Sequence, residues 1–257
     1  MNILFCGSIC GKLGREVIKK ILPELKEEFS VDFVVANGER AGDDANSILP
    51  KDCEELRNLG IDCVTTGECV WNKKEMTKAL YNLDESILRP ANYPPSLPGK
   101  GYSIFLNRIC VINLQGRAFM PIIDCPFRKF DEIYETIKDK TKIIIVDFHA
   151  QASAEKNAFS WYVNGRASCV IGTHVRVQTA DERILSKGTG MLTDVGLVGA
   201  HDAIGGLKVG SVLKMFVSGV PFKTIPANSS PGFEGVLIQI EDENGKCKKL
   251  DRLQIRL

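Results

Sequence analysis

The sequence predicts an α/β protein that forms one layered domain over residues 1–257. In the first half, short apolar runs alternate with segments whose apolar residues recur every three to four positions. The second half adds pairs of strand-like runs joined by short polar turns. With 44% hydrophobic and 25% charged residues, the composition is that of an ordinary globular protein. We expect a mainly parallel sheet with helices on both faces and antiparallel strands at its edge.

The first half contains three predicted strands and three predicted helices in alternation. A strand over residues 2–6 is followed by a glycine-containing loop and a helix over 15–29. One face of that helix is apolar, with Val17, Ile18, Ile21, Leu22 and Leu25. Further strands are predicted over 32–37 and 61–66, and further helices over 51–58 and 73–81.

Several prolines interrupt this alternation, so residues 87–95 are predicted to be irregular. Two hairpins are expected in the second half. The first joins runs 102–106 and 109–114, and the second joins runs 236–240 and 247–255 through Asn244-Gly245. Helical periodicity over 130–138 precedes the very apolar strand 142–148, and another apolar run covers 168–173. The glycine-rich stretch 205–210 is interpreted as a turn because it lacks phosphate-loop spacing.

Charge and hydropathy exclude several classes of function. The formal net charge of +1 predicts no bulk attraction to nucleic acid or to a membrane surface. No apolar stretch approaches the roughly 20 residues that span a bilayer. The nine cysteines include no C-x-x-C pair, so we expect buried, reduced thiols and no structural zinc. The N-terminus starts directly with a strand-like run, and we predict a cytoplasmic protein.

Three apolar runs end in residues that can bind a metal. They end in Glu39, His149 and His174, and the last two account for two of the chain's three histidines. Ligand crevices of open α/β sheets lie outside the carboxyl ends of the strands, so these side chains are expected to converge. The sequence therefore predicts a metal or phosphate site at these strand ends.

Ordered sequence blocks make the prediction more specific. Asn37-Gly38-Glu39, residues 67–71 (GECVW), residues 147–150 (DFHA) and residues 172–176 (GTHVR) stand in the order of the blocks of calcineurin-like metallophosphoesterases. Residues 89–92, 113–117, 165–168 and 177–181 match further, and the chain resembles the bacterial YmdB-like branch from Met1 to about Ile255.

This resemblance implies a sandwich of two sheets flanked by helices, with two metals at the strand ends. A metal-bridging water would attack a phosphodiester, and members of the branch are described as cyclic-nucleotide phosphodiesterases. Divalent cations suit this chemistry because they neutralise the phosphate and lower the pKa of bound water. The resemblance also implies a homo-oligomer and a nucleotide or phosphodiester ligand.

Several family ligand positions carry other residues in this chain. Glu39, His149 and His174 match the bridging carboxylate and two imidazole ligands of the family. The family's other residues are replaced by Ser8 (for Asp), Arg40 (for Asn), Glu68 (for Asn), Cys69 (for His) and Arg176 (for His). The substitutions at Ser8, Arg40 and Arg176 each make the site more positive by one charge, and the one at Glu68 makes it more negative by one. The net change of +2 equals the charge of one divalent cation.

The resemblance therefore implies half of a two-metal centre. Glu39, Glu68, His149 and His174 form a credible set for one divalent metal, iron, manganese or zinc. Arg40 and Arg176 are predicted either to replace the other metal as an internal ion-pair cluster with the carboxylates or to hold a substrate phosphate. A site that holds no metal stays open, because the two histidines also fit as core residues and Glu68 as a solvated acid.

Three functions follow from this interpretation. The favoured one is a degenerate YmdB-like phosphoesterase with weak or no activity, which binds one metal or none and a nucleotide or phosphate. An active, metal-dependent 2′,3′-cyclic-nucleotide phosphodiesterase with a rebuilt site is the first alternative, and a structural or scaffolding protein is the second. Cys69 as a nucleophile and His201 as a replacement acid are the remaining catalytic candidates.

Overall fold

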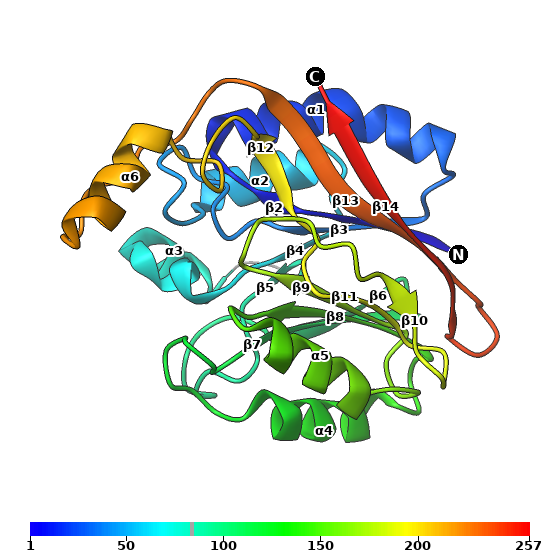
Figure 1. Ribbon diagram of the computed structural model, residues 1–257. Helices are drawn as coiled ribbons and strands as arrows, with labels where there is room; N and C mark the ends of the chain where they lie inside the picture. Colours follow the sequence, from blue (N-terminus) through cyan, green and yellow to red (C-terminus); the bar gives the residue numbers. More distant parts are fainter. Residues whose placement is uncertain (83–84) are drawn as a thin grey trace.

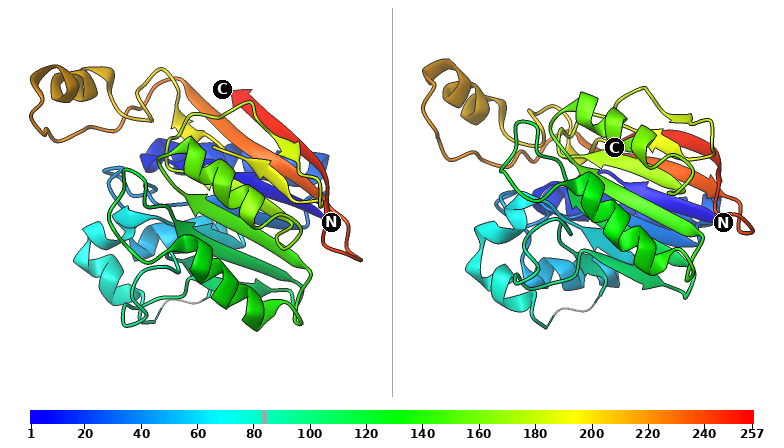
Figure 2. Two further views of the ribbon diagram at one scale, coloured as in Figure 1. Left: turned by 60° about the horizontal axis from the view of Figure 1, so that its bottom comes forward. Right: turned by 90° about the horizontal axis from the view of Figure 1, so that it is seen from below.

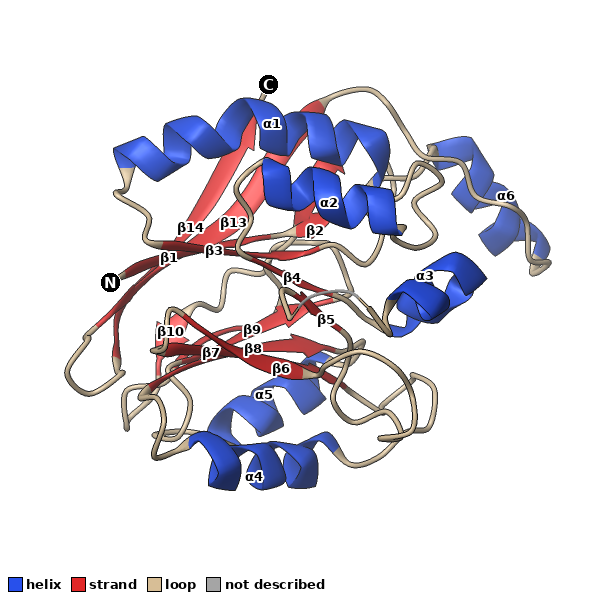
Figure 3. Ribbon diagram, turned by 180° about the vertical axis from the view of Figure 1, so that it is seen from behind, coloured by secondary structure: helices blue, strands red, loops and turns tan. Residues whose placement is uncertain are grey.

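The computed structural model describes residues 1–82 and 85–257 and shows two β-sheets packed face to face (Figures 1 and 3). The first sheet has the order β2-β12-β13-β1-β3-β4-β5, and β14 pairs with β13. Its strands are β1 (Asn2–Cys6), β2 (Ser8–Ile9), β3 (Phe33–Asn37), β4 (Cys63–Thr65), β5 (Ile87–Leu88), β12 (Leu197–Ala200), β13 (Pro231–Ile240) and β14 (Cys247–Arg256). β1, β3, β4 and β5 run parallel, whereas β13 pairs antiparallel with β1, β12 and β14.

The second sheet has the order β10-β11-β9-β8-β7-β6. Its strands are β6 (Tyr102–Phe105), β7 (Ile109–Gln115), β8 (Ile143–His149), β9 (Cys169–Thr173), β10 (Arg183–Ile184) and β11 (Gly190–Leu192). The four central strands β7, β8, β9 and β11 are parallel, and β6 and β7 form the first predicted hairpin.

Alternation along the strands fills three apolar layers. In β1, Ile3 and Phe5 pack in the layer between the sheets, while Leu4 and Cys6 belong to the layer beneath the outer helices. Helices α1 (Gly11–Glu28) and α2 (Pro50–Asn58) cover the outer face of the first sheet, and α4 (Pro126–Ile137) and α5 (Ser153–Tyr162) cover that of the second (Figure 3). Figure 2 shows the same layers after rotation.

The expectation of one sheet with helices on both faces is wrong, and the two-sheet sandwich implied by the family resemblance is confirmed. The proline-rich segment after β5 carries the chain to the second sheet instead of into another crossover helix. Each sheet then has helices on one face only, because the other face is covered by the opposite sheet.

Several local predictions also need correction. The irregular segment 87–95 begins with the short edge strand β5, and the glycine-rich stretch 205–210 runs into a helix, α6 (Val209–Ser218). The short helices η1 (Glu68–Asn72) and α3 (Lys74–Ala79) follow β4, with α3 shorter than predicted. Helices α1 and α4 each begin four residues before the predicted start.

Among the described residues, no helix combines the length and the apolar character that a membrane crossing requires.

Candidate metal centre

The ends of strands from both sheets supply the predicted ligands. Glu39 stands two residues beyond the end of β3, and Glu68 is the first residue of η1, after β4. His149 is the last residue of β8 and His174 directly follows β9. The first two come from one sheet and the last two from the other, so the face-to-face packing of the sheets is what creates the site.

The four side chains form one compact cluster. One ligand atom from each of Glu39, Glu68, His149 and His174 can be chosen so that all lie within 4.8 Å of one another. His149 Nε2 lies 3.3 Å from a Glu39 oxygen, 3.0 Å from a Glu68 oxygen and 3.1 Å from His174 Nδ1. Ligand atoms about 2.0–2.2 Å from a shared zinc would be separated by similar distances, so the donor set fits one divalent ion.

Gly67 lets the chain pass close to this cluster. A Cβ at this position would lie 2.2 Å from His149 Nε2 and 2.4 Å from Glu39 Oε1. Real Cβ atoms do not approach other heavy atoms so closely, so only glycine leaves the cluster intact. The backbone that follows Gly67 also orients a ligand, because the Cys69 amide donates a hydrogen bond of 2.9 Å to Glu39 Oε1.

A buried hydrogen-bond chain orients His149 from behind. Thr173 Oγ1 donates to Asp147 Oδ1 at 2.6 Å and therefore accepts from His149 Nδ1 at 2.9 Å. Asn37 and Thr65 donate to the other oxygen of Asp147. With this hydrogen held on Nδ1, Nε2 is the His149 atom that faces the cluster and would bind an ion, the arrangement that metal-binding histidines share.

The charges of the cluster shift the pKa values of its members in opposite directions. Burial alone would lower the pKa of His149, but the carboxylates of Glu39 and Glu68 outweigh burial and raise that pKa to about 10. Burial and the neighbouring His149 lower the pKa of His174 to about 4. Burial would raise the pKa of Glu39, and the His149 imidazole reverses this effect and lowers it. The two histidines thus differ in their protonation near neutral pH: without a metal ion, His149 carries the additional proton, whereas His174 is neutral.

Arg40 and Arg176 lie beside the cluster, and both are close to Cys10. Arg40 Nε is 3.9 Å from Glu39 Oε2, and its Nη1 donates to the Ala45 carbonyl at 3.0 Å. Arg176 Nη1 donates to the Gly205 carbonyl at 2.6 Å, and its Nε is buried without a hydrogen-bond partner. The Ser8 hydroxyl is also buried and unpartnered. The two guanidinium groups are therefore held mainly by main-chain carbonyls. Among the described residues, Arg40 also forms a long ion pair with Glu39, and Arg176 forms none.

The structure argues against Cys69 and His201 as catalytic groups. Burial and the negative charge of Glu39 raise the pKa of the Cys69 thiol to about 12, so the nucleophilic thiolate is not formed near neutral pH. His201 lies away from the cluster, with Nδ1 3.7 Å from Glu234, a residue of β13 that also pairs with Arg256.

A second buried ion pair, absent from the sequence-based prediction, supports the His174 loop. Lys156 of α5 and Asp194 are 2% and 1% exposed, and Nζ lies 2.9 Å from Oδ2. The same Asp194 oxygen accepts from the Val175 amide at 3.0 Å. Val175 separates His174 and Arg176, which both have left-handed φ values, of 95° and 63°. The ion pair thus holds a strained stretch that carries one ligand and one guanidinium.

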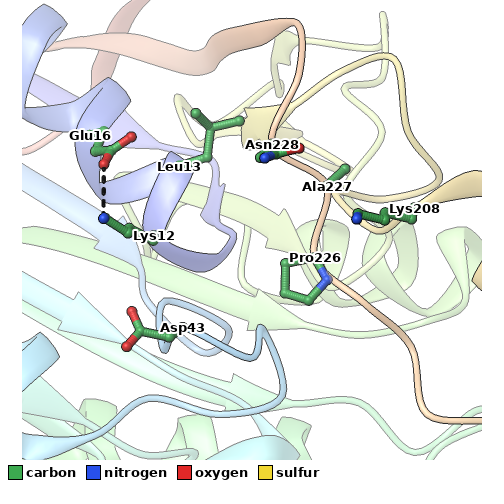
Figure 4. A pocket seen from close by; sticks show the side chains of 8 residues that line it. All are labelled: Lys12, Leu13, Glu16, Asp43, Lys208, Pro226, Ala227 and Asn228. Carbon is green, nitrogen blue, oxygen red and sulfur yellow. Dashed lines mark ion pairs between the residues drawn. The ribbon is translucent and has the colours of Figure 1, made fainter.

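A separate pocket of about 370 Å³ lies between the first turns of α1 and the segment 226–228 (Figure 4). Its lining includes Lys12 and Glu16, which form a surface ion pair of 3.7 Å. None of the four cluster residues lines it, so we assign it no part in the metal chemistry.

Two packed sheets with outer helices, and a two-carboxylate, two-imidazole cluster at the strand ends, are the features of the metallophosphoesterase fold. The chain belongs to the YmdB-like family, whose profile, described as YmdB-like protein, matches residues 4–253. It is 40% identical to the 2′,3′-cyclic-nucleotide 2′-phosphodiesterase of Bacillus subtilis (strain 168), over 99% of this chain and 97% of the relative. The family resemblance is thereby confirmed.

Solved structures agree with this assignment. A hypothetical protein from Thermus thermophilus aligns with a TM-score of 0.90 and 32% identity, over 100% of this chain and 99% of that one. A phosphatase from Mycoplasma pneumoniae also aligns with a TM-score of 0.90, at 28% identity over 100% of this chain and 93% of that one.

Proposed function

We propose that this chain binds one divalent cation and a phosphate or nucleotide, with weak or no phosphodiesterase turnover. The cation would be held by Glu39, Glu68, His149 and His174, and the anionic ligand by Arg40 and Arg176. The observation that carries the proposal is the contrast between the complete four-residue cluster and its arginine-lined neighbourhood.

The donor chemistry supports one cation rather than two. Two imidazoles and two carboxylates suit zinc, iron or manganese, and a divalent metal is what the family implies. The described residues contain no further group of three or more His, Cys, Asp or Glu side chains able to bind another ion. The family resemblance gives the other metal the positions of Ser8, Glu39 and Arg176, and of these only Glu39 suits a cation.

The arginines support an anionic ligand. The ion pair of Arg40 is long, with 3.9 Å between its Nε and Glu39 Oε2. Glu39 therefore does not engage the Arg40 guanidinium bidentately. The buried Nε of Arg176 lacks a hydrogen-bond partner, and a guanidinium group is well suited to donate to phosphate oxygens.

Weak turnover follows from what the site lacks. When bound, a divalent ion polarises the phosphoryl group and activates water, but a pair of ions clamps both the attacking and the leaving oxygen. A general acid typically contributes about 10²–10⁴-fold in rate, and Cys69 stands where the family resemblance expects the assisting histidine.

The second candidate is an active phosphodiesterase with a rebuilt, single-metal site. It is favoured by the 40% identity to a relative named as a 2′,3′-cyclic-nucleotide 2′-phosphodiesterase. In that case Arg40 and Arg176 would hold the substrate phosphate while the single ion activates water.

Metal analysis and a hydrolysis assay on the same preparation separate these functions. We expect one equivalent of metal per chain, calorimetric binding of inorganic phosphate that Arg176→Ala weakens, and little hydrolysis of a 2′,3′-cyclic nucleotide with manganese or iron supplied. Two tightly bound metals per chain would overturn the proposal. Turnover that His149→Ala abolishes would establish the second candidate. Absence of both metal and phosphate binding would leave the scaffolding function.

A further inference from the structure

Trp71 and Tyr93 form an aromatic pair beside the metal cluster. Trp71 belongs to η1, three positions after Glu68, and Tyr93 lies in the proline-rich segment after β5. Both side chains are half-buried, and their ring centroids are 5.3 Å apart with an interplanar angle of 62°. The pair therefore forms an edge-to-face aromatic corner next to one of the cluster ligands.

The order of the strands places the arginines and the aromatic pair on opposite sides of the cluster. In the first sheet β3, β4 and β5 are neighbours in this order, and Arg40, Glu68 and Tyr93 follow them. The order β9, β8, β7 in the second sheet likewise leads from Arg176, after β9, to Gln115 at the end of β7. A ligand whose phosphate binds to the arginines would therefore extend past the cluster toward the aromatic pair.

Gln115 connects the aromatic pair with the cluster. It is 0% exposed and pairs in register with His149, so both side chains leave the same face of the second sheet. Its Oε1 accepts a hydrogen bond of 3.1 Å from the Tyr93 hydroxyl. Asn92 donates to the Gln115 carbonyl at 2.7 Å and accepts from the Gln115 amide at 2.9 Å. These bonds fix Tyr93 at the end of β7, beside the strand that carries His149.

Two donors in this group have no partner. The side-chain Nε2 of Gln115 and the indole Nε1 of Trp71 are both buried, and neither has a hydrogen-bond partner. A buried N–H group without an acceptor is costly, and native proteins retain few of them. A ligand that supplies acceptors would satisfy these donors, and a planar ligand could also stack on the aromatic pair.

The charges near the aromatic pair favour a neutral ligand group. Burial raises the pKa of the Tyr93 hydroxyl, and the carboxylates of Glu68 and Glu39 raise it further. The phenol is therefore uncharged near neutral pH, and its charged neighbours are negative. The positive charges of Arg40 and Arg176 lie on the other side of the cluster, so an anionic and a neutral part of one ligand would have separate places.

We propose that the aromatic pair and Gln115 bind the base of a nucleotide. The inference rests on the proposed function, in which Arg40 and Arg176 hold the phosphate of the same ligand. A nucleobase is planar and neutral, and its edge carries ring nitrogens and carbonyl oxygens that accept hydrogen bonds. It would stack on the accessible part of the aromatic pair and accept from the indole and from the Gln115 amide.

Calorimetry with two matched ligands tests the proposal on the full chain with manganese supplied. Uridine 5′-monophosphate and ribose 5-phosphate differ in the base, and the first should bind about tenfold more tightly because its base stacks on the aromatic pair. Tyr93→Leu should reduce this ratio of affinities to about one. Tyr162→Leu is the matched control and should keep the ratio, because Tyr162 is the last residue of α5, on the outer face of the second sheet (Figure 3).

Tryptophan fluorescence gives a second readout that leaves the aromatic pair unaltered. The chain has two tryptophans, and Trp161 is 53% exposed on α5. In the Trp161→Phe variant, Trp71 is the only tryptophan that emits. Uridine 5′-monophosphate should quench this emission, whereas ribose 5-phosphate should leave it unchanged.

The possible results separate this proposal from the proposed function. Equal affinities for the two ligands, with unchanged Trp71 emission, would overturn the base site and leave phosphate binding intact. A ratio that Tyr93→Leu retains, in a variant with the metal content of the unaltered protein, would also overturn it. If neither ligand nor inorganic phosphate binds, the proposed function fails, and the base site fails with it.

Discussion

The affinity of the cluster for manganese should rise with pH well beyond the range of an ordinary histidine. The ion-free cluster holds a proton on His149, whose pKa is raised to about 10, and a metal ion must displace it. At pH 7 this proton lowers the affinity about a thousandfold, or about 4 kcal/mol, since each pKa unit corresponds to 1.36 kcal/mol. His174, with its pKa lowered to about 4, is already neutral and adds no further slope.

The sign of the effect follows from the proton balance. Raising the pH removes the competing proton, so affinity should increase about tenfold per pH unit between about pH 6 and 8.5. Titration calorimetry in two buffers of different ionisation enthalpy would measure both the affinity and the release of one proton per ion bound. An unperturbed histidine, with a pKa of about 6.5, would give an affinity that levels off above about pH 7. A plateau there, or binding without proton release, would refute the charge coupling between His149 and the two carboxylates.

Three sets of substitutions test the structural support and the assignment of the site. Gly67→Ala should cost about 1–3 kcal/mol of metal-binding free energy because its Cβ would collide with His149 and Glu39, whereas Gly210→Ala, which has open space around it, should bind metal normally in the same calorimetric assay. Lys156→Met should lower the free energy of unfolding by about 3–5 kcal/mol because it leaves Asp194 buried and unpaired, whereas Lys51→Met removes a surface ion pair and should cost less than about 1 kcal/mol in urea unfolding. A variant that rebuilds the family pattern combines Ser8→Asp, Arg40→Asn, Glu68→Asn, Cys69→His and Arg176→His. It should bind two metal ions per chain and hydrolyse a cyclic nucleotide about 10²-fold faster or more. An unchanged metal content in the folded variant would contradict the assignment of these positions.

The positions of three of the four cluster residues were predictable because strand ends have a simple geometry, whereas Glu68 came from the family resemblance. Glu39, His149 and His174 follow apolar runs that are parallel strands, and parallel strands bring their carboxyl ends to one edge. That reasoning does not specify which sheet each strand joins. The sequence pattern alone favoured one sheet, while the second sheet came from the family resemblance.

The supporting residues were not predictable in the same way. Asp147 and Asn37 are 110 positions apart, and Lys156 and Asp194 are 38 apart, so their contacts depend on how the layers pack. In the sequence, Lys156 looks like a solvated helix residue and Asp147 like a polar interruption of an apolar strand. Helix α6 was missed because Gly210 lies in its first turn and Gly205 and Gly206 precede it, so the start of the helix was interpreted as part of a glycine-rich turn.

The geometry around Arg40 and Arg176 bears on the two roles that the sequence left open. Charge counting alone favoured an ion-pair cluster, since the substitutions supply two positive charges next to two carboxylates. Such a cluster would engage each guanidinium with carboxylate oxygens at hydrogen-bond distance, and the Arg40–Glu39 separation of 3.9 Å is too long for that. Arg176 is instead fixed by the Gly205 carbonyl while its Nε stays unpartnered. Two guanidinium groups held mainly by neutral carbonyls retain donors that a phosphate oxygen needs, which supports the phosphate-binding role that we propose.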